Sequence, residues 1–279
     1  MKLVRFAAPF VLFTGGKGGV GKTTLAVNLG VHLASTGTRV LLVDLDLGLA
    51  NIDVLLKLAP RANIEDALAG RVPIAECVME GPGGIHVLPA GSGTIAMAAL
   101  DDDRRARLLT ALAQLAPQYD VLIGDSAAGI GPDVLAFGAA AQIVFAVTTP
   151  DPTALTDAYG LIKALELAAA ERGLEVATPE LILNQVSGVD EAEDVARKLA
   201  EVCRRFLARS PRLAGWMPRS PRVLEAGRRQ TVFALAPSKG GAHSLERLCL
   251  ERLGERLLRL CGRCDAPILA AQAGGNHVR

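Results

Sequence analysis

The sequence contains no apolar run long enough to cross a membrane. Half of its 279 residues are hydrophobic, but they fall in short runs, whereas a spanning helix needs about 18 to 20 consecutive apolar residues. The opening stretch MKLVRFAAPFVLFTGG has a basic residue and an apolar run, as signal peptides do. Because this run leads directly into a glycine-rich loop, we interpret it as the first buried strand. We therefore expect a soluble protein of the cytoplasm.

An excess of charge of either sign is also missing. Thirty basic residues face 29 acidic ones, which leaves a formal net charge of +1. This balance provides no bulk electrostatic reason to bind nucleic acid, and we do not expect nucleic acid as a partner.

Cysteine and histidine are scarce: the cysteines are not spaced as a disulfide framework, and the histidines are not spaced as metal ligands. The odd number of cysteines fits a reducing compartment. The four histidines are scattered along the chain. The five cysteines are Cys77, Cys203, Cys249, Cys261 and Cys264.

Short apolar runs alternate with amphipathic stretches of helical length. Strands are expected over 9–14, 40–44, 85–89, 120–125, 142–148, 181–184 and 213–217, and helices over 22–35, 104–115, 154–170, 190–208 and 244–261. Strands that are apolar throughout are buried on both faces. The pattern predicts an α/β fold, a doubly wound, mostly parallel sheet with helices on both faces. Ligands of such sheets bind at the carboxyl ends of the strands.

A phosphate-binding loop follows the first expected strand and opens the first expected helix. The run GKGGVGKT, residues 16–23, satisfies the G-x-x-x-x-G-K-[ST] pattern of a P-loop. Its backbone amides cradle phosphates, Lys22 reaches the β- and γ-phosphates, and the Thr23 hydroxyl is a Mg²⁺ ligand. The sequence thus predicts an ATP/ADP and Mg²⁺ site. The expected nucleotide contacts are Gly16, Gly18, Gly19, Val20, Gly21, Lys22, Thr23 and Thr24.

Lys17 departs from a minimal P-loop. When the loop amides point inward at the phosphates, a side chain at this position points outward, where its own nucleotide offers it nothing to neutralise. The nucleotide of a second subunit is a fitting target, and a solvated lysine that steers anions is the alternative.

Three aspartates follow expected strands and meet the same edge of the sheet. Asp44 and Asp46 end the second strand, and Asp125 ends the strand that begins at Asp120. Carboxylates placed there hold Mg²⁺ or orient an attacking water in phosphoryl transfer. The alternative for Asp44 and Asp46 is that they cap a following helix, expected over Leu47 to Leu55.

These motifs resemble the MinD/ParA family of ATPases, whose deviant Walker A loop carries a lysine near its start. The resemblance implies that Lys17 crosses an ATP-bound homodimer to the partner's phosphates. It implies that Asp46 positions the hydrolytic water, with Asp44 supporting the metal and the water network, and that Asp125 belongs to the Walker B strand. Asn184 and Pro218 match the positions where the family holds adenine.

Three further stretches extend the resemblance, within this family, to the flagellar-number regulators of the FlhG/FleN group. They are DLGLANIDVLL at 46–56, GPGGIHVLPAGSG at 81–93 and TPDPTALTDAY at 149–159. This resemblance implies a protein partner, such as an FlhF-like GTPase. Members of the group carry a short N-terminal extension that docks on that GTPase, whereas this chain begins almost directly at its first expected strand.

The sequence is expected to form one P-loop ATPase domain over 1–262, followed by a flexible tail over 263–279. The helix 244–261 is amphipathic, and relatives use a C-terminal helix of this kind to bind the inner face of the cell membrane when ATP is bound. Packing of this helix on the domain is the alternative. Cys261 and Cys264 form a C-x-x-C pair, and the related Mrp-type ATPases hold an iron–sulfur cluster on such a pair. The alternative, which the position beyond the ATPase core favours, is a pair in the tail that binds no metal.

Taken together, the residues predict a slow ATPase switch. ATP-dependent homodimerisation is coupled to membrane or partner binding and controls the number or position of a cell structure such as the flagellum. A ParA-type DNA partition ATPase and an Mrp-type iron–sulfur carrier are the alternative functions.

Overall fold

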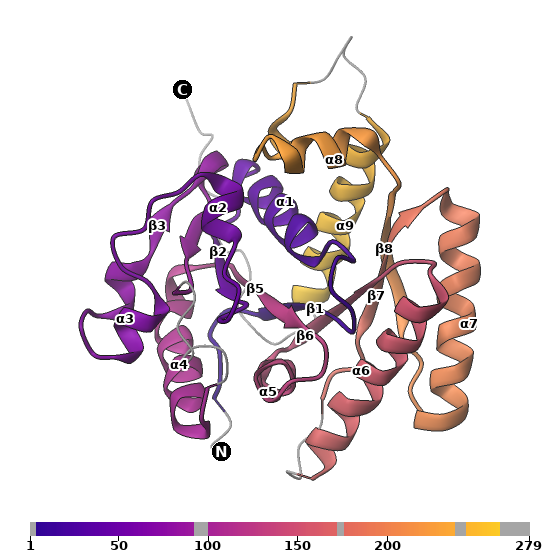
Figure 1. The fold of residues 1–279 in the computed structure, drawn as a ribbon, viewed down its shortest axis with the longest axis horizontal. Coiled ribbons are helices and arrows are strands. Elements are labelled where there is room, and N and C mark those ends of the chain that lie inside the picture. The colour runs from indigo at the N-terminus through magenta and orange to yellow at the C-terminus, as the bar shows by residue number, and fades with distance from the viewer. Residues whose placement is uncertain (1–3, 92–99, 172–175, 238–243, 263–279) are drawn as a thin grey trace, which may run out of the picture.

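The computed structural model describes residues 4–91, 100–171, 176–237 and 244–262 (Figure 1). The described strands form an eight-stranded sheet in the order β3-β4-β2-β5-β1-β6-β7-β8. Every neighbouring pair is parallel except β3 with β4, at one edge. The expected fold class, a doubly wound and mostly parallel sheet, is confirmed.

Among the described residues, the first element is strand β1 and the last is helix α9. The strands are β1 (Phe10–Gly15), β2 (Val40–Leu45), β3 (Met79–Glu80), β4 (His86–Leu88), β5 (Val121–Ala128), β6 (Ile143–Thr148), β7 (Glu180–Val186) and β8 (Arg212–Pro218). The α-helices are α1 (Lys22–Ser35), α2 (Ile52–Leu56), α3 (Ile64–Leu68), α4 (Asp102–Leu115), α5 (Pro132–Ala140), α6 (Pro152–Ala170), α7 (Val189–Leu207), α8 (Pro221–Arg228) and α9 (Leu245–Cys261). The short 3₁₀ turns are η1 (Ile74–Cys77), η2 (Pro82–Gly84), η3 (Ala116–Gln118) and η4 (Phe233–Leu235).

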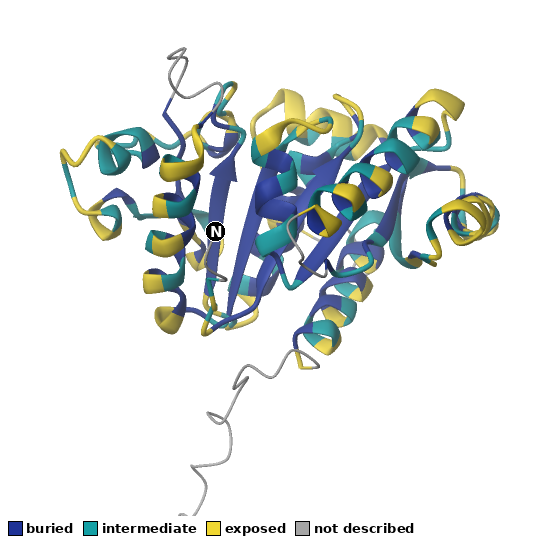
Figure 2. Cartoon of the chain, turned by 90° about the horizontal axis from the view of Figure 1, so that it is seen from below, coloured by how far each residue is buried: buried dark blue, intermediate teal, exposed yellow. Residues whose placement is uncertain are grey.

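Helices cover both faces of the sheet because successive residues of each strand point to opposite sides. In β1, Val11 and Phe13 belong to the core beneath α1 and α9. Phe10 and Leu12 belong to the core beneath α4, α5 and α6. Figure 2 shows the central strands buried between helices whose outer faces are exposed. Parallel strands covered on both faces bring their carboxyl ends, and the loops after them, to one edge.

The expected strands and helices are all present, with ends shifted by a few residues, but the segment after Asp46 differs from the prediction. A helix was expected over Leu47 to Leu55, whereas α2 begins only at Ile52. The preceding loop is held by polar contacts: Asp46 Oδ1 accepts a hydrogen bond from the Leu49 amide, at 3.3 Å. The sequence analysis also missed α3, α5, α8 and the edge strand β3.

Helix α9 lies against the domain. Its buried residues are Cys249, Leu250, Leu253, Gly254, Leu257 and Cys261, and the helix packs against α1 and β8. Among the large apolar side chains of α9, only Leu245 and Leu248 are exposed. The structure therefore favours the packed alternative over a helix whose apolar face is free to enter a membrane. The predicted tail 263–279, with Cys264, lies outside the described residues.

No described helix has the length and apolar character needed to span a membrane.

Candidate nucleotide site

The P-loop connects β1 to α1 and requires glycine at several positions. Gly19 and Gly21 have φ of 79° and 92°, in the left-handed region that side chains disfavour. A Cβ at Gly16 would lie 2.2 Å from the Asp157 carbonyl oxygen, so the backbone of α6 approaches the loop closely there. Gly18 and Gly19 have open space around them. The loop is thus bounded by α6 at its start and open along its outer arc.

Lys22 and Thr23 form the first turn of α1, directly after the loop. Lys22 is 7% exposed and lies near enough to Asp46 and Asp125 to oppose the rise in the pKa of each. The Thr23 hydroxyl donates a hydrogen bond of 2.5 Å to Asp125 Oδ2. The structure thus brings together the two residues predicted as Mg²⁺ ligands on α1 and β5.

Asp125 has one carboxylate oxygen that is buried and without a hydrogen-bond partner among the described residues, Oδ1. Burial raises the pKa of Asp125 to about 7; the neighbouring Asp44 contributes, and the Thr23 hydrogen bond opposes the rise. An unpaired carboxylate oxygen beside a threonine hydroxyl provides the hard oxygen ligands that Mg²⁺ takes. These residues therefore fit a Mg²⁺ ion. The described residues contain no group of three or more His, Cys, Asp or Glu placed to hold a metal.

Asp44 stands opposite Asp125 in the parallel register of β2 and β5, and its carboxylate is occupied by the chain itself. Oδ1 accepts from the Asp46 amide at 3.1 Å, and Oδ2 accepts from the amides of Asn51 at 3.0 Å and Ile52 at 3.1 Å. Burial raises the pKa of Asp44 to about 6 against these hydrogen bonds. These contacts favour the capping alternative for Asp44, since its carboxylate fixes the loop 46–51 to the start of α2.

Asp46 lies within that loop and is half-buried. Burial raises its pKa, which the Leu49 amide and Lys22 oppose. Its position beside Lys22 and at the carboxyl end of β2 agrees with the placement expected for a residue that orients water. The capping alternative does not hold for Asp46, because α2 begins six residues further on.

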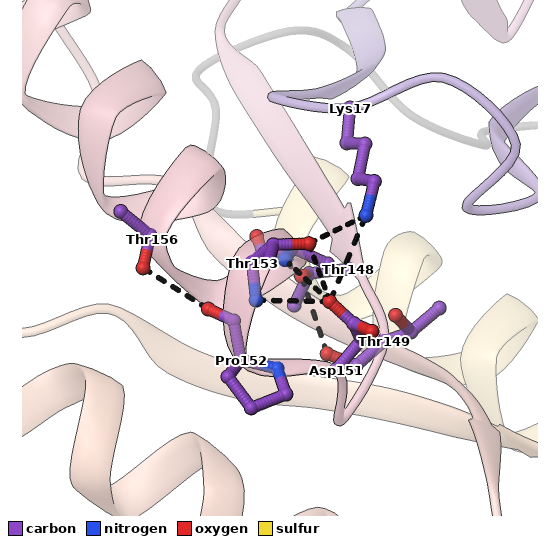
Figure 3. A network of polar contacts seen from close by, with 8 residues as sticks. Lys17, Thr148, Thr149, Asp151, Pro152, Thr153 and Thr156 are labelled. Atoms are coloured by element: carbon purple, nitrogen blue, oxygen red, sulfur yellow. Dashed lines mark hydrogen bonds and ion pairs between the residues drawn. The ribbon is translucent and has the colours of Figure 1, made fainter.

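Lys17 is held by its own chain (Figure 3). Its Nζ donates a hydrogen bond of 2.5 Å to Thr153 Oγ1 and lies 3.6 Å from Asp151 Oδ1. Asp151 caps α6 by accepting from the amides of Thr153 and Ala154. The hydrogen bond from the Thr153 hydroxyl is the main cause that lowers the pKa of Asp151 to about 2, and Lys17 also contributes. The Lys17 ammonium group therefore lies at the N-terminus of α6.

The sequence analysis did not identify Asp151 and Thr153 as partners of Lys17. The available signal was the run Asp151-Pro152-Thr153 after an apolar strand, which is typical of a capped helix start. It located the helix but not the lysine that reaches it from 136 residues away.

Asn184 and Pro218, the residues expected near adenine, lie near the carboxyl ends of β7 and β8. Asn184 is buried, and its Nδ2 donates to the Val20 carbonyl of the P-loop at 2.7 Å. Pro218 pairs with Val186. A cavity of 490 Å³ adjoins this region, lined by Lys17, Gly18, Gly19, Val20, Thr149, Pro150, Asp151, Gln185, Glu191 and Arg219. A larger cavity of 1160 Å³ lies along α8, η4 and the start of α9, and none of the predicted site residues line it.

The chain is similar to several proteins of known family. Residues 11–233 match the CobQ/CobB/MinD/ParA nucleotide binding domain. The antiactivator FleN of Pseudomonas aeruginosa is 40% identical over 220 residues, which cover 79% of this chain and 77% of FleN. The flagellum site-determining protein YlxH of Helicobacter pylori is 36% identical over 154 residues, 55% of this chain and 52% of YlxH.

A solved structure shows the same fold. The MinC:MinD cell division complex of Aquifex aeolicus matches with a TM-score of 0.69 and 26% identity, over 90% of this chain and 96% of that chain. The chain belongs to the CobQ/CobB/MinD/ParA nucleotide-binding family and is a P-loop ATPase of the MinD/ParA type, with ATP or ADP and Mg²⁺ as its cofactors.

Proposed function

We propose that this ATPase is a two-state switch in which Mg·ATP brings two copies of the chain together face to face. The observation that carries the proposal is the position of Lys17, whose ammonium group is bound to Thr153 and Asp151 at the start of α6. In the ATP-bound dimer, Lys17 leaves Asp151 and Thr153 and reaches the phosphates of the second copy. Hydrolysis then reopens the dimer, so the product of the cycle is a change of state.

Each residue of the site has a distinct part in this cycle. The loop amides from Gly16 to Thr24 bind the phosphates, and Lys22 neutralises the charge that develops on them. Thr23 and Asp125 hold Mg²⁺, which neutralises charge on the β- and γ-phosphates when bound. Asp46 orients the attacking water, and Asp44 supports it by fixing the loop 46–51. Asn184 and Pro218 flank the adenine base.

The cellular role proposed for the switch is control of the number or position of a structure such as the flagellum. The similarity to FleN and to the flagellum site-determining protein YlxH supports this role. A protein partner that senses the dimer, such as an FlhF-like GTPase, fits the role, and the complex of MinD with MinC is a precedent for a partner protein. We place the dimer in the cytoplasm or peripherally at the membrane; the packing of α9 argues against 244–261 as the membrane contact.

Gel filtration with and without ATP tests the switch. Asp46→Ala is expected to accumulate an ATP-bound dimer, Lys17→Ala to remain monomeric with ATP, and Lys22→Ala to lose nucleotide. Lys163→Ala, an exposed lysine on α6 outside the site, is the matched control and should behave as the unaltered protein. An Asp46→Ala protein that binds ATP and stays monomeric would contradict the proposal.

A further inference from the structure

Asn184, near the carboxyl end of β7, makes a buried contact with the P-loop. Its side-chain amide Nδ2 donates to the Val20 carbonyl at 2.7 Å, across 164 residues of sequence. Its Oδ1 accepts from the Gln185 amide at 2.9 Å, which fixes the orientation of the side chain. Asn184 is only 8% exposed. Both polar groups of this residue are therefore engaged within the chain, one of them by the loop.

The loop leaves room for this amide at the next residue. A Cβ at Gly21 would lie 2.2 Å from Asn184 Nδ2, and Gly21 has a φ of 92°. Gly21 therefore serves two purposes, a left-handed backbone and close approach of the asparagine. Val20 and Gly21, the two residues before Lys22, are thus both in contact with one side chain.

Gly18 and Gly19, in the middle of the loop, have little around them to restrain them. A Cβ at Gly18 or Gly19 would meet nothing within 4 Å, and glycine gains the most conformational freedom when it is unrestrained. At its start the loop is confined by the backbone of α6 near Gly16. At its end two long-range hydrogen bonds restrain the loop, from the Thr23 hydroxyl to Asp125 and from Asn184 to the backbone carbonyl of Val20. Of the two, the one from Asn184 binds the loop backbone.

We infer that Asn184 is a positioning residue that holds the P-loop in its phosphate-binding shape before nucleotide arrives, in addition to the adenine contact proposed above. A loop that is already ordered loses less conformational freedom when it binds its ligand. The inference rests on the P-loop as the nucleotide site, and it assigns to Asn184 a contribution to phosphate binding that does not involve the base.

Amide hydrogen exchange in the absence of nucleotide tests this role directly. Asn184→Ala and the similarly sized Asn184→Leu both remove the donor to Val20. In both variants, exchange in a peptide covering 16–24 is expected to be about tenfold faster, the effect of losing one buried hydrogen bond. Exchange in α4, which lies away from the loop, should not change.

Gln185→Asn is the matched control. Gln185 adjoins Asn184 and has a φ of 59°, a conformation that asparagine tolerates, and the structure records no hydrogen bond from its side chain within the described ranges. This variant should exchange as the unaltered protein does.

Inorganic tripolyphosphate with Mg²⁺ separates the two roles of Asn184 because it has phosphates and no base. Its ability to displace a fluorescent ATP analogue should fall about tenfold in both Asn184 variants. Unchanged exchange over 16–24 would overturn the inference and leave Asn184 as a base contact. Faster exchange throughout the chain would also overturn it, because Asn184 would then contribute to the stability of the whole domain. Normal exchange with Asn184→Leu would overturn it as well, because the side chain would then only fill space. Since these exchange experiments require neither ATP nor a dimer, they fail or succeed independently of the switch.

Discussion

At the scale of single residues, the main feature of the site is its buried aspartates. In the nucleotide-free protein, hydrogen bonds and nearby cations offset only part of the cost of burying their charge. Asp125 is the clearest case, with one oxygen bonded to Thr23 and the other unpaired among the described residues. The cost of its burial is offset when a cation arrives. The charge that favours Mg²⁺ binding therefore works against folding without Mg²⁺.

The cost of burying the charged Asp125 carboxylate predicts that the free energy of unfolding depends on pH. The folded pKa of Asp125 is raised to about 7, so between the unfolded value of about 4 and pH 7 the folded state holds more protons than the unfolded state. Stability of the nucleotide-free, metal-free protein should fall as the pH rises through this range. Asp125→Asn should reduce the fall and abolish Mg²⁺-dependent hydrolysis. Thermal melting from pH 5 to pH 8 measures both proteins, and parallel curves would contradict the assignment.

At the scale of secondary-structure elements, one residue at the start of α6 both caps the helix and contacts Lys17. This residue is Asp151, whose carboxylate accepts hydrogen bonds from the first amides of α6 and forms an ion pair with Lys17. Because asparagine caps helices as well as aspartate does, Asp151→Asn should keep the cap and lose the ion pair. We expect this variant to dimerise at lower protein concentration with ATP, since Lys17 is released more easily.

Sedimentation velocity with ATP measures that change, and Asp151→Ala separates the two contributions. The alanine variant should dimerise as the asparagine variant does but lose about 1 kcal/mol of stability through the missing cap. If Asp151→Asn dimerises no more readily than the unaltered protein, the contact with Lys17 does not restrain the dimer.

Helix α9 is the second element whose role the structure changes. Leu253 is 2% exposed and packs in the core with α1 and β8. Leu253→Ala should therefore cost about 2 to 5 kcal/mol of unfolding free energy. Leu248→Ala, at a position that is 41% exposed, should cost about 0.5 kcal/mol or less. Chemical denaturation measures both, and equal small effects would show that α9 is not part of the folded domain.

At the scale of the whole molecule, the sequence predicted the sheet and the residues along its ligand edge. Apolar strands and glycine-rich loops are local patterns, so the P-loop, Asp46 and Asp125 could be placed from sequence. The contacts between distant segments could not. Three features depend on tertiary structure that no local pattern contains: the contact of Lys17 with α6, the hydrogen bond from Asn184 to Val20, and the packing of α9.

The contacts of Asp44 with the start of α2 are a shorter-range example of structure that the sequence did not predict. Its place at the end of β2 was evident from the sequence, but residues 47–51 were expected to be helical, as part of a helix over Leu47 to Leu55. The carboxylate of Asp44 binds the amides of Asn51 and Ile52 and so delays the start of α2. A buried acid thus overrides local helical preference.

The central claim, that Lys17 acts on the nucleotide of a second copy, is tested most directly by mixing two inactive variants. Lys17→Ala lacks the lysine but keeps Asp46, and Asp46→Ala keeps the lysine. In a mixed dimer, the site of the Lys17→Ala copy contains its own Asp46 and receives Lys17 from the other copy. The account predicts that steady-state ATP hydrolysis of the equimolar mixture rises well above the sum of the two variants alone. A mixture no more active than that sum, with both variants folded and the dimer present, would contradict it.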